Sequence, residues 1–148
     1  MIGSVTDVAN AILSISGGGS FPNGNIAVAN AWADVADTLL AQAIPPSTTT
    51  TQARTAFISI MTGVTNTPPN GIPLLKSAFM SYAAALALGM TGFTSVPPAV
   101  PPMIETVITA PTEDSNSVAY ALASLLVTWA ATGVATLIAP PYTVSNWN

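Results

Sequence analysis

Apolar residues recur every three to four positions along the first part of the chain, which is the spacing of one face of an α-helix. The segments with this pattern span residues 4–16, 25–43, 47–64 and 71–90. Ser4, followed three residues later by Asp7, has the form of a capping box and predicts the start of the first helix. Gly89 or Gly92 is expected to end the fourth.

A further helix is expected to begin near Thr112 and to include the uncharged run "VAYALASLLVTWAATGVATLIAPP". A helix needs about 20 apolar residues to cross a bilayer, so residues 118–139 are also a candidate transmembrane segment. Gly133, which lies among threonines, predicts an earlier end that leaves too short a helix to span. No Lys or Arg follows Lys76, so a positively charged anchor is missing. We therefore favour a buried helix.

Pairs of prolines separate the helical segments and resist both helix interiors and sheet ladders. Residues 95–111 are expected to form an extended Pro-rich connector, with a short turn or strand at Met103 to Ile108. Residues 139–148 are expected to form an extended tail. No segment alternates convincingly over six or more residues, as a longer strand would. The predicted fold is all-α, with residues 1–148 as a single-domain bundle of about five helices joined by Pro/Gly-rich loops.

The chain is nearly free of charge. Only 5% of its 148 residues are charged, with six acids, two bases and a net charge of −4, whereas a typical soluble domain has about 25%. Two cations are too few to neutralise nucleic-acid phosphates or to dock on an anionic membrane. The chain has no Cys and no His, which excludes thiol catalysis, disulfides and most zinc or copper sites. No cofactor is expected.

Three features carry chemistry in principle, and each has a simpler explanation. Asp34 and Asp37 form a carboxylate pair on one helix, which suits acid–base work or a hard cation but also a solvated face. The segment "GGGSFPNG", residues 17–24, lacks the Lys of a phosphate-binding loop and reads better as an inter-helix loop. Lys76 next to Ser77 lacks the order of a Ser-x-x-Lys motif. We therefore expect no enzymatic activity.

The low charge favours an assembled subunit, because an uncharged surface loses its water cheaply when subunits meet. Trp147 lies in an uncharged segment and is expected to dock either on a neighbouring subunit or back on its own bundle. The candidate contact residues are Phe21, Pro22, Pro97, Pro98, Pro101, Pro102, Tyr142 and Trp147. Symmetry would then repeat one interface many times.

Several stretches resemble small virion structural proteins of tailed bacteriophages, of the marine and cyanobacterial type. They are "AILSISGGGSFP", "AWAD", "LLKSAFMSYAAALALGM", "GFTSVPPAVPP" and "TWAATGVAT" with the later "PP" and "NWN". The resemblance implies a non-enzymatic component of the tail, baseplate, neck or capsid surface, located in the virion. Its partners would be copies of itself and other virion proteins, without nucleic acid, membrane or small-molecule substrate.

Two alternatives stay open at this point. One is a small membrane-associated protein with a transmembrane helix at residues 118–139. The other is a small helical module that holds an apolar ligand between its helices. Each makes a structural demand: the first needs an unbroken helix through those residues, and the second needs a sizeable cavity.

Overall fold

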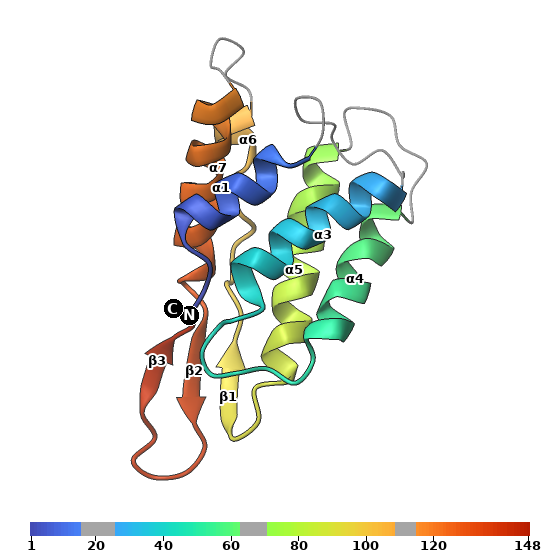
Figure 1. Ribbon diagram of the computed structural model, residues 1–148. Helices are drawn as coiled ribbons and strands as arrows, with labels where there is room; N and C mark the ends of the chain where they lie inside the picture. Colours follow the sequence, from blue (N-terminus) through green and yellow to red (C-terminus); the bar gives the residue numbers. More distant parts are fainter. Residues whose placement is uncertain (16–25, 63–70, 109–114) are drawn as a thin grey trace.

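The computed structural model of the protein describes residues 1–15, 26–62, 71–108 and 115–148 (Figure 1). The elements are α1 (Val5–Leu13), α3 (Ile26–Leu40), α4 (Thr50–Thr62), α5 (Gly71–Leu88), β1 (Phe93–Val96), α6 (Glu105–Ile108), α7 (Ser115–Ala130), β2 (Val134–Leu137) and β3 (Val144–Asn146). The helices pack into one body, and a small sheet extends below it in the view of Figure 1.

The described part of the chain is mainly helical, as predicted, but it is not all-α. It contains six helices and a three-stranded antiparallel sheet in the order β1-β2-β3. The long helices follow the predicted segments closely, and α6 adds a short helix that the sequence did not suggest. The expectation of a turn or strand at Met103 to Ile108 was wrong, because Glu105–Ile108 is helical.

Helix α1 begins where the capping pattern predicts. The Ser4 hydroxyl accepts a hydrogen bond from the Asp7 backbone N–H at 3.1 Å and donates one to the Asp7 carboxylate at 2.7 Å. A serine oxygen in this position satisfies one of the N–H groups that the first turn of a helix leaves unpaired. The acidic side chain also lies at the positive end of the helix dipole. Both effects favour a helix start at this point.

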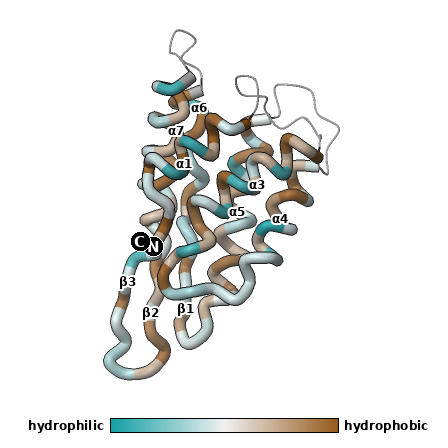
Figure 2. Tube along the Cα trace, in the orientation of Figure 1, coloured by the Kyte–Doolittle hydropathy of each residue, from teal (hydrophilic) through white to brown (hydrophobic). Residues whose placement is uncertain are grey.

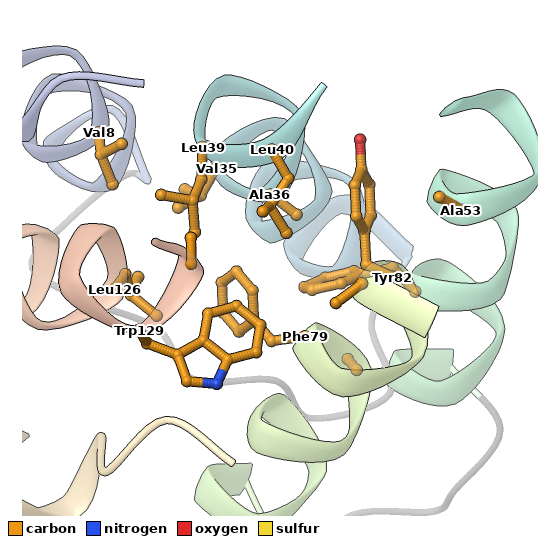
Figure 3. Close-up of a cluster of buried hydrophobic side chains, with 14 of the residues drawn as sticks. Val8, Val35, Ala36, Leu39, Leu40, Ala53, Phe79, Tyr82, Leu126 and Trp129 are labelled. Atoms are coloured by element: carbon orange, nitrogen blue, oxygen red, sulfur yellow. The ribbon is translucent and has the colours of Figure 1, made fainter. Parts of the chain in front are cut away.

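The core lies between α3, α5 and α7, with α1 and α4 closing its two sides (Figure 3). Three aromatic contacts hold its centre. The ring of Phe79 meets Phe57 edge-on at 5.2 Å and Trp129 edge-on at 6.1 Å, while Tyr82 meets Phe57 at 6.4 Å. Hydrophobic and hydrophilic positions alternate at short intervals along the helices (Figure 2). Edge-to-face pairs of this kind add to the stability that burial alone gives.

The loop before α4 caps the end of α5. The hydroxyl of Ser47 donates to the Leu86 carbonyl at 2.7 Å, and that of Thr49 donates to the Ala85 carbonyl at 2.7 Å. These are carbonyls that the last turn of a helix leaves without a partner. Helix α5 ends at Leu88, directly before Gly89, which is one of the two predicted ends. The threonine-rich segment therefore serves as a helix entry, as its composition suggested.

The sheet joins two parts of the chain that lie far apart in the sequence, β1 and the β2–β3 hairpin. Strand β1 begins before the segment predicted to be a connector and ends inside it, and β2 and β3 form a hairpin around the Pro140–Pro141 pair. The segment expected to be an extended tail, residues 139–148, is tied to the fold, because β3 pairs antiparallel with β2. The expected connector at 95–111 is also interrupted, by the end of β1 and by α6.

Helix α7 does not cover the candidate transmembrane segment 118–139. It ends at Ala130, the chain turns through Gly133, and β2 follows. The predicted end near Gly133 is thus confirmed. Within the described ranges, one helix, α5, is long and apolar enough to cross a membrane by length and composition. That helix packs against α4 and supplies Leu75, Phe79 and Tyr82 to the core.

Candidate functional site

The two carboxylates on α3 belong to an ion-pair network. Arg54 of α4 reaches across to Asp34 at 2.9 Å and also pairs with Asp37. The hydroxyl of Tyr82 donates a hydrogen bond to the other oxygen of Asp37 at 2.7 Å. The pair that could have served acid–base chemistry therefore ties α3 to α4 and α5 instead.

The network raises the pKa of two of its members. Burial of the hydroxyl, and then its hydrogen bond to Asp37, raise the pKa of Tyr82 well above its ordinary value of 10.0. Partial desolvation acts to lower the pKa of Arg54, but its hydrogen bonds and charge interactions with Asp37 and Asp34 together raise it. Tyr82 thus stays a hydrogen-bond donor and Arg54 stays a cation.

Lys76, the second cation, is also paired. Its ammonium lies 3.0 Å from the Glu105 carboxylate and joins α5 to α6. The backbone N–H of Glu105, and then Lys76, lower the pKa of that carboxyl. Lys76 and Ser77 both border a shallow surface hollow of about 750 Å³ that Glu105 also lines. The ammonium is therefore engaged by a carboxylate, which does not favour its use as a base for a serine.

The prolines proposed as contact residues lie partly inside the fold. Pro98 and Pro102 are buried, Pro97 is half-buried and Pro101 is exposed. The indole N–H of Trp129 donates to the Val100 carbonyl at 2.6 Å and fastens this segment to α7. Phe21 and Pro22 lie outside the described residues, as does the rest of the predicted loop at residues 17–24. Of the four described prolines named as candidates, Pro101 is the one with an exposed side chain.

A groove runs between this segment and α7. Its volume is about 650 Å³, and its walls are largely apolar. Val100 and Met103 lie along one wall and are more than half exposed, while Leu125 and Trp129 belong to α7 on the other. An apolar ligand could contact these walls, but the groove opens to the surface and is not the enclosed cavity between helices that the ligand-binding alternative demands.

Trp147 docks back on its own chain. Its side chain is fully buried, its indole N–H donates to the Ser95 hydroxyl at 2.9 Å, and its backbone N–H donates to the Gly133 carbonyl at 3.0 Å. The ring lies so close to Gly133 that a Cβ added there would come within 2.4 Å of it. The second of the two expectations for Trp147 is therefore the one seen in the structure. Tyr142, at the hairpin turn, is 58% exposed.

The sheet presents an outer face that the sequence analysis missed. Register places the side chains of Thr94, Val96, Val134, Thr136, Val144 and Asn146 on this face. Val96 is 56% exposed and Val144 is 65% exposed. The opposite face carries Ser95, Ala135 and Trp147 and packs on the helices. The signal in the sequence was the short β-branched runs "FTSV" and "VATL", which directly follow Gly92 and Gly133.

This part of the molecule carries no charge. Residues 89–104 and 131–148, which include the whole sheet, contain no Asp, Glu, Lys or Arg. The outer face is therefore built from β-branched side chains and one asparagine. Comparisons of the chain with protein-family models, with curated proteins and with solved structures found no match.

Proposed function

We propose that the protein is a non-enzymatic structural subunit that acts through repeated contacts with other subunits. In line with the sequence resemblance, the assembly would be a tailed-phage virion, in its tail, baseplate, neck or capsid surface. The observation that carries the proposal is the distribution of charge. Both cations of the chain are held in internal ion pairs, and the sheet is uncharged and exposes large apolar side chains.

The physical argument concerns the loss of water. A charged side chain that enters an interface must give up its hydration, and the cores of subunit interfaces are accordingly depleted of charge. On the sheet no ion has to be moved when another surface approaches. Val96 and Val144 would gain from burial, at roughly 25 cal/mol for each Å² of apolar surface removed from water. A freely diffusing monomer would usually cover such a surface with Lys and Glu.

The state of the polar groups favours a structural role over catalysis. Asp34 and Asp37 share Arg54, and Lys76 is bound by Glu105. Across the described ranges, no cluster of three or more acidic, His or Cys residues is placed to hold a metal ion. Each of these groups has a structural task that accounts for its position.

Native mass spectrometry and analytical ultracentrifugation over a wide concentration range test the proposal, without detergent. We expect species at multiples of the 14.9 kDa chain mass. These should persist at high salt, because screening does not weaken contacts between uncharged surfaces. Mass spectrometry of purified virions would then show whether the assembly belongs to the particle. A lone chain at every concentration, freely soluble and with its sheet uncovered, would refute the proposal.

The same measurements separate the alternatives. A membrane-associated protein would sediment with vesicles and need detergent for release. A carrier of apolar ligands would run as a monomer. It would bind a fluorescent apolar probe in the α7 groove, and substitutions at Leu125 would weaken that binding.

A further inference from the structure

Strand β3 forms an open edge of the sheet. Its three residues, Val144–Asn146, are all exposed, and β2 is its neighbour on one side. An edge strand presents unpaired N–H and C=O groups and is a template for pairing with another strand. Proteins commonly protect such edges with charged side chains or proline, and β3 has neither.

The hydrogen-bond pattern fixes which groups point outward. The N–H of Leu137 donates to the Thr143 carbonyl, and the N–H of Trp147 donates to the Gly133 carbonyl. Along an antiparallel ladder every second pair is hydrogen-bonded. The pair Ala135–Ser145 lies midway between these two bonded pairs and is therefore bonded too, so Ser145 directs its backbone N–H and C=O toward β2. Val144 and Asn146 then direct theirs away from the sheet. The hydrogen bond from the Ile138 N–H to the Gly92 carbonyl agrees with this alternation, because it directs the even-numbered residues of β2 toward β1.

This arrangement is self-complementary, and we propose that β3 pairs antiparallel with β3 of a second copy of the chain. With Ser145 on the two-fold axis, Val144 lies opposite Asn146 of the second copy, and Asn146 lies opposite its Val144. Each of these pairs joins two outward-facing residues, so each can exchange both of its N–H···O=C bonds. The two sheets then become one sheet of twice the width. A shift of one residue would set outward groups against inward ones and lose these bonds.

Side chains and charge support a second copy as the occupant. Two copies carry the same net charge of −4, yet no charged residue of either lies on the sheet, so like charges are kept away from the contact. Pairing places the outer faces of the two sheets side by side, with Val144 of each copy near the new junction. A two-fold axis requires a surface that is complementary to itself, which β3 satisfies.

The inference deepens the proposed function, on which it rests, by naming one of the repeated contacts. A three-residue ladder is short, and stable interfaces bury more surface than it can. We therefore expect the contact to be weak for an isolated pair and to be strengthened when other contacts hold the copies together.

A single-cysteine variant tests the register directly, because the chain has no cysteine of its own. In the proposed pair, the two Ser145 residues form a non-hydrogen-bonded pair with Cα atoms about 4.5 Å apart, a distance that a disulfide can bridge. Ser145→Cys should therefore form a disulfide-linked dimer under mild oxidation. Thr94→Cys is the matched control, since it is also exposed on the sheet but lies on β1. We expect about tenfold less cross-linked dimer from this control.

A second variant tests whether the cross-linked contact depends on the edge of β3. Val144→Lys, made in the Ser145→Cys background, places a charge beside the axis and should reduce cross-linking about tenfold. Thr94→Lys in the same background should leave the amount of cross-linked dimer unchanged. Circular dichroism of both variants serves as the control for folding. Assembly without Ser145→Cys cross-linking, or cross-linking that Val144→Lys does not reduce, overturns the β3 pairing but not the structural role. A monomer in every assay overturns both. Cross-linking to an unrelated protein instead of to itself would also overturn the choice of a second copy.

Discussion

The contact between Gly133 and Trp147 allows a prediction about stability that does not depend on assembly. A Cβ at Gly133 would lie 2.4 Å from Cδ2 of Trp147 and 2.7 Å from Cε3. These atoms belong to a fully buried ring. Among the described glycines, a positive φ occurs only at Gly92, so the backbone at position 133 suits alanine and steric overlap is the main effect.

The expected magnitudes follow from packing. Gly133→Ala should lower the free energy of unfolding by about 2 kcal/mol, the usual cost of overfilling a packed site. Trp147→Ala should lower it by about 4 kcal/mol, because it empties a large buried volume and removes the donor to Ser95. In the Trp147→Ala background the overlap disappears. Gly133→Ala should then cost almost nothing, which is a coupling of about 2 kcal/mol between the two changes.

Urea unfolding followed by far-ultraviolet circular dichroism measures all four proteins, at one fixed protein concentration so that self-association does not bias the comparison. Tyr142→Ala serves as the control, since that exposed side chain should contribute less than about 0.5 kcal/mol. Additive losses in the double variant would show that the Trp147 ring does not lie against Gly133. An unchanged stability in Trp147→Ala would show that the indole is not part of the folded core.

Three further predictions concern substitutions at single positions. Gly89→Ala should cost about 2 kcal/mol in urea unfolding, because its Cβ would meet the Thr49 hydroxyl at 2.2 Å and disturb the cap on α5; an unchanged midpoint would contradict that packing. Because the pKa of Tyr82 is raised in the folded state, stability should fall as the pH rises above 10.0, by at most about 1.4 kcal/mol per pH unit. Tyr82→Phe should lack this fall, and an equal slope in both proteins would refute the assignment. Because the pKa of Glu105 is lowered, the stability it contributes is present above 4.5 and lost as the pH falls below it. Glu105→Gln should therefore show a shallower acid dependence in thermal unfolding than the parent, and matching curves would argue against the Lys76 pairing.

The helices could be predicted because their determinants are local. The Ser4 cap, the glycine after α5 and the apolar faces all lie within a few residues of the structure they specify. The sheet could not, because each of its strands has three or four residues and shows too little alternation to be recognised. Its stability depends on pairing between β1 and β2, which lie far apart in the sequence. A strand of this kind is recognisable only beside its partner.

The shortage of charge predicted contact surfaces without charge, and this stays a prediction. Of the candidate contact residues, Tyr142 has an exposed side chain. The burial of Pro98 and Pro102 was not predicted, and for Trp147 the sequence left two docking sites open. Each is covered by residues that only the folded chain brings near, such as Ser95 for Trp147. Proline and tryptophan suit an interior and an interface equally well, so residue type alone does not decide between them.

The placement of the two cations has a practical consequence for handling the protein. Trypsin cleaves after Lys and Arg, and in this chain that means after Arg54 and Lys76 alone. Both residues lie within helices and are held by carboxylates of neighbouring helices. A protease needs an extended substrate, so digestion at either position must wait for the surrounding helices to open. The rate of tryptic digestion therefore measures how often these helices open. Complete digestion gives three peptides, which are easy to separate and quantify.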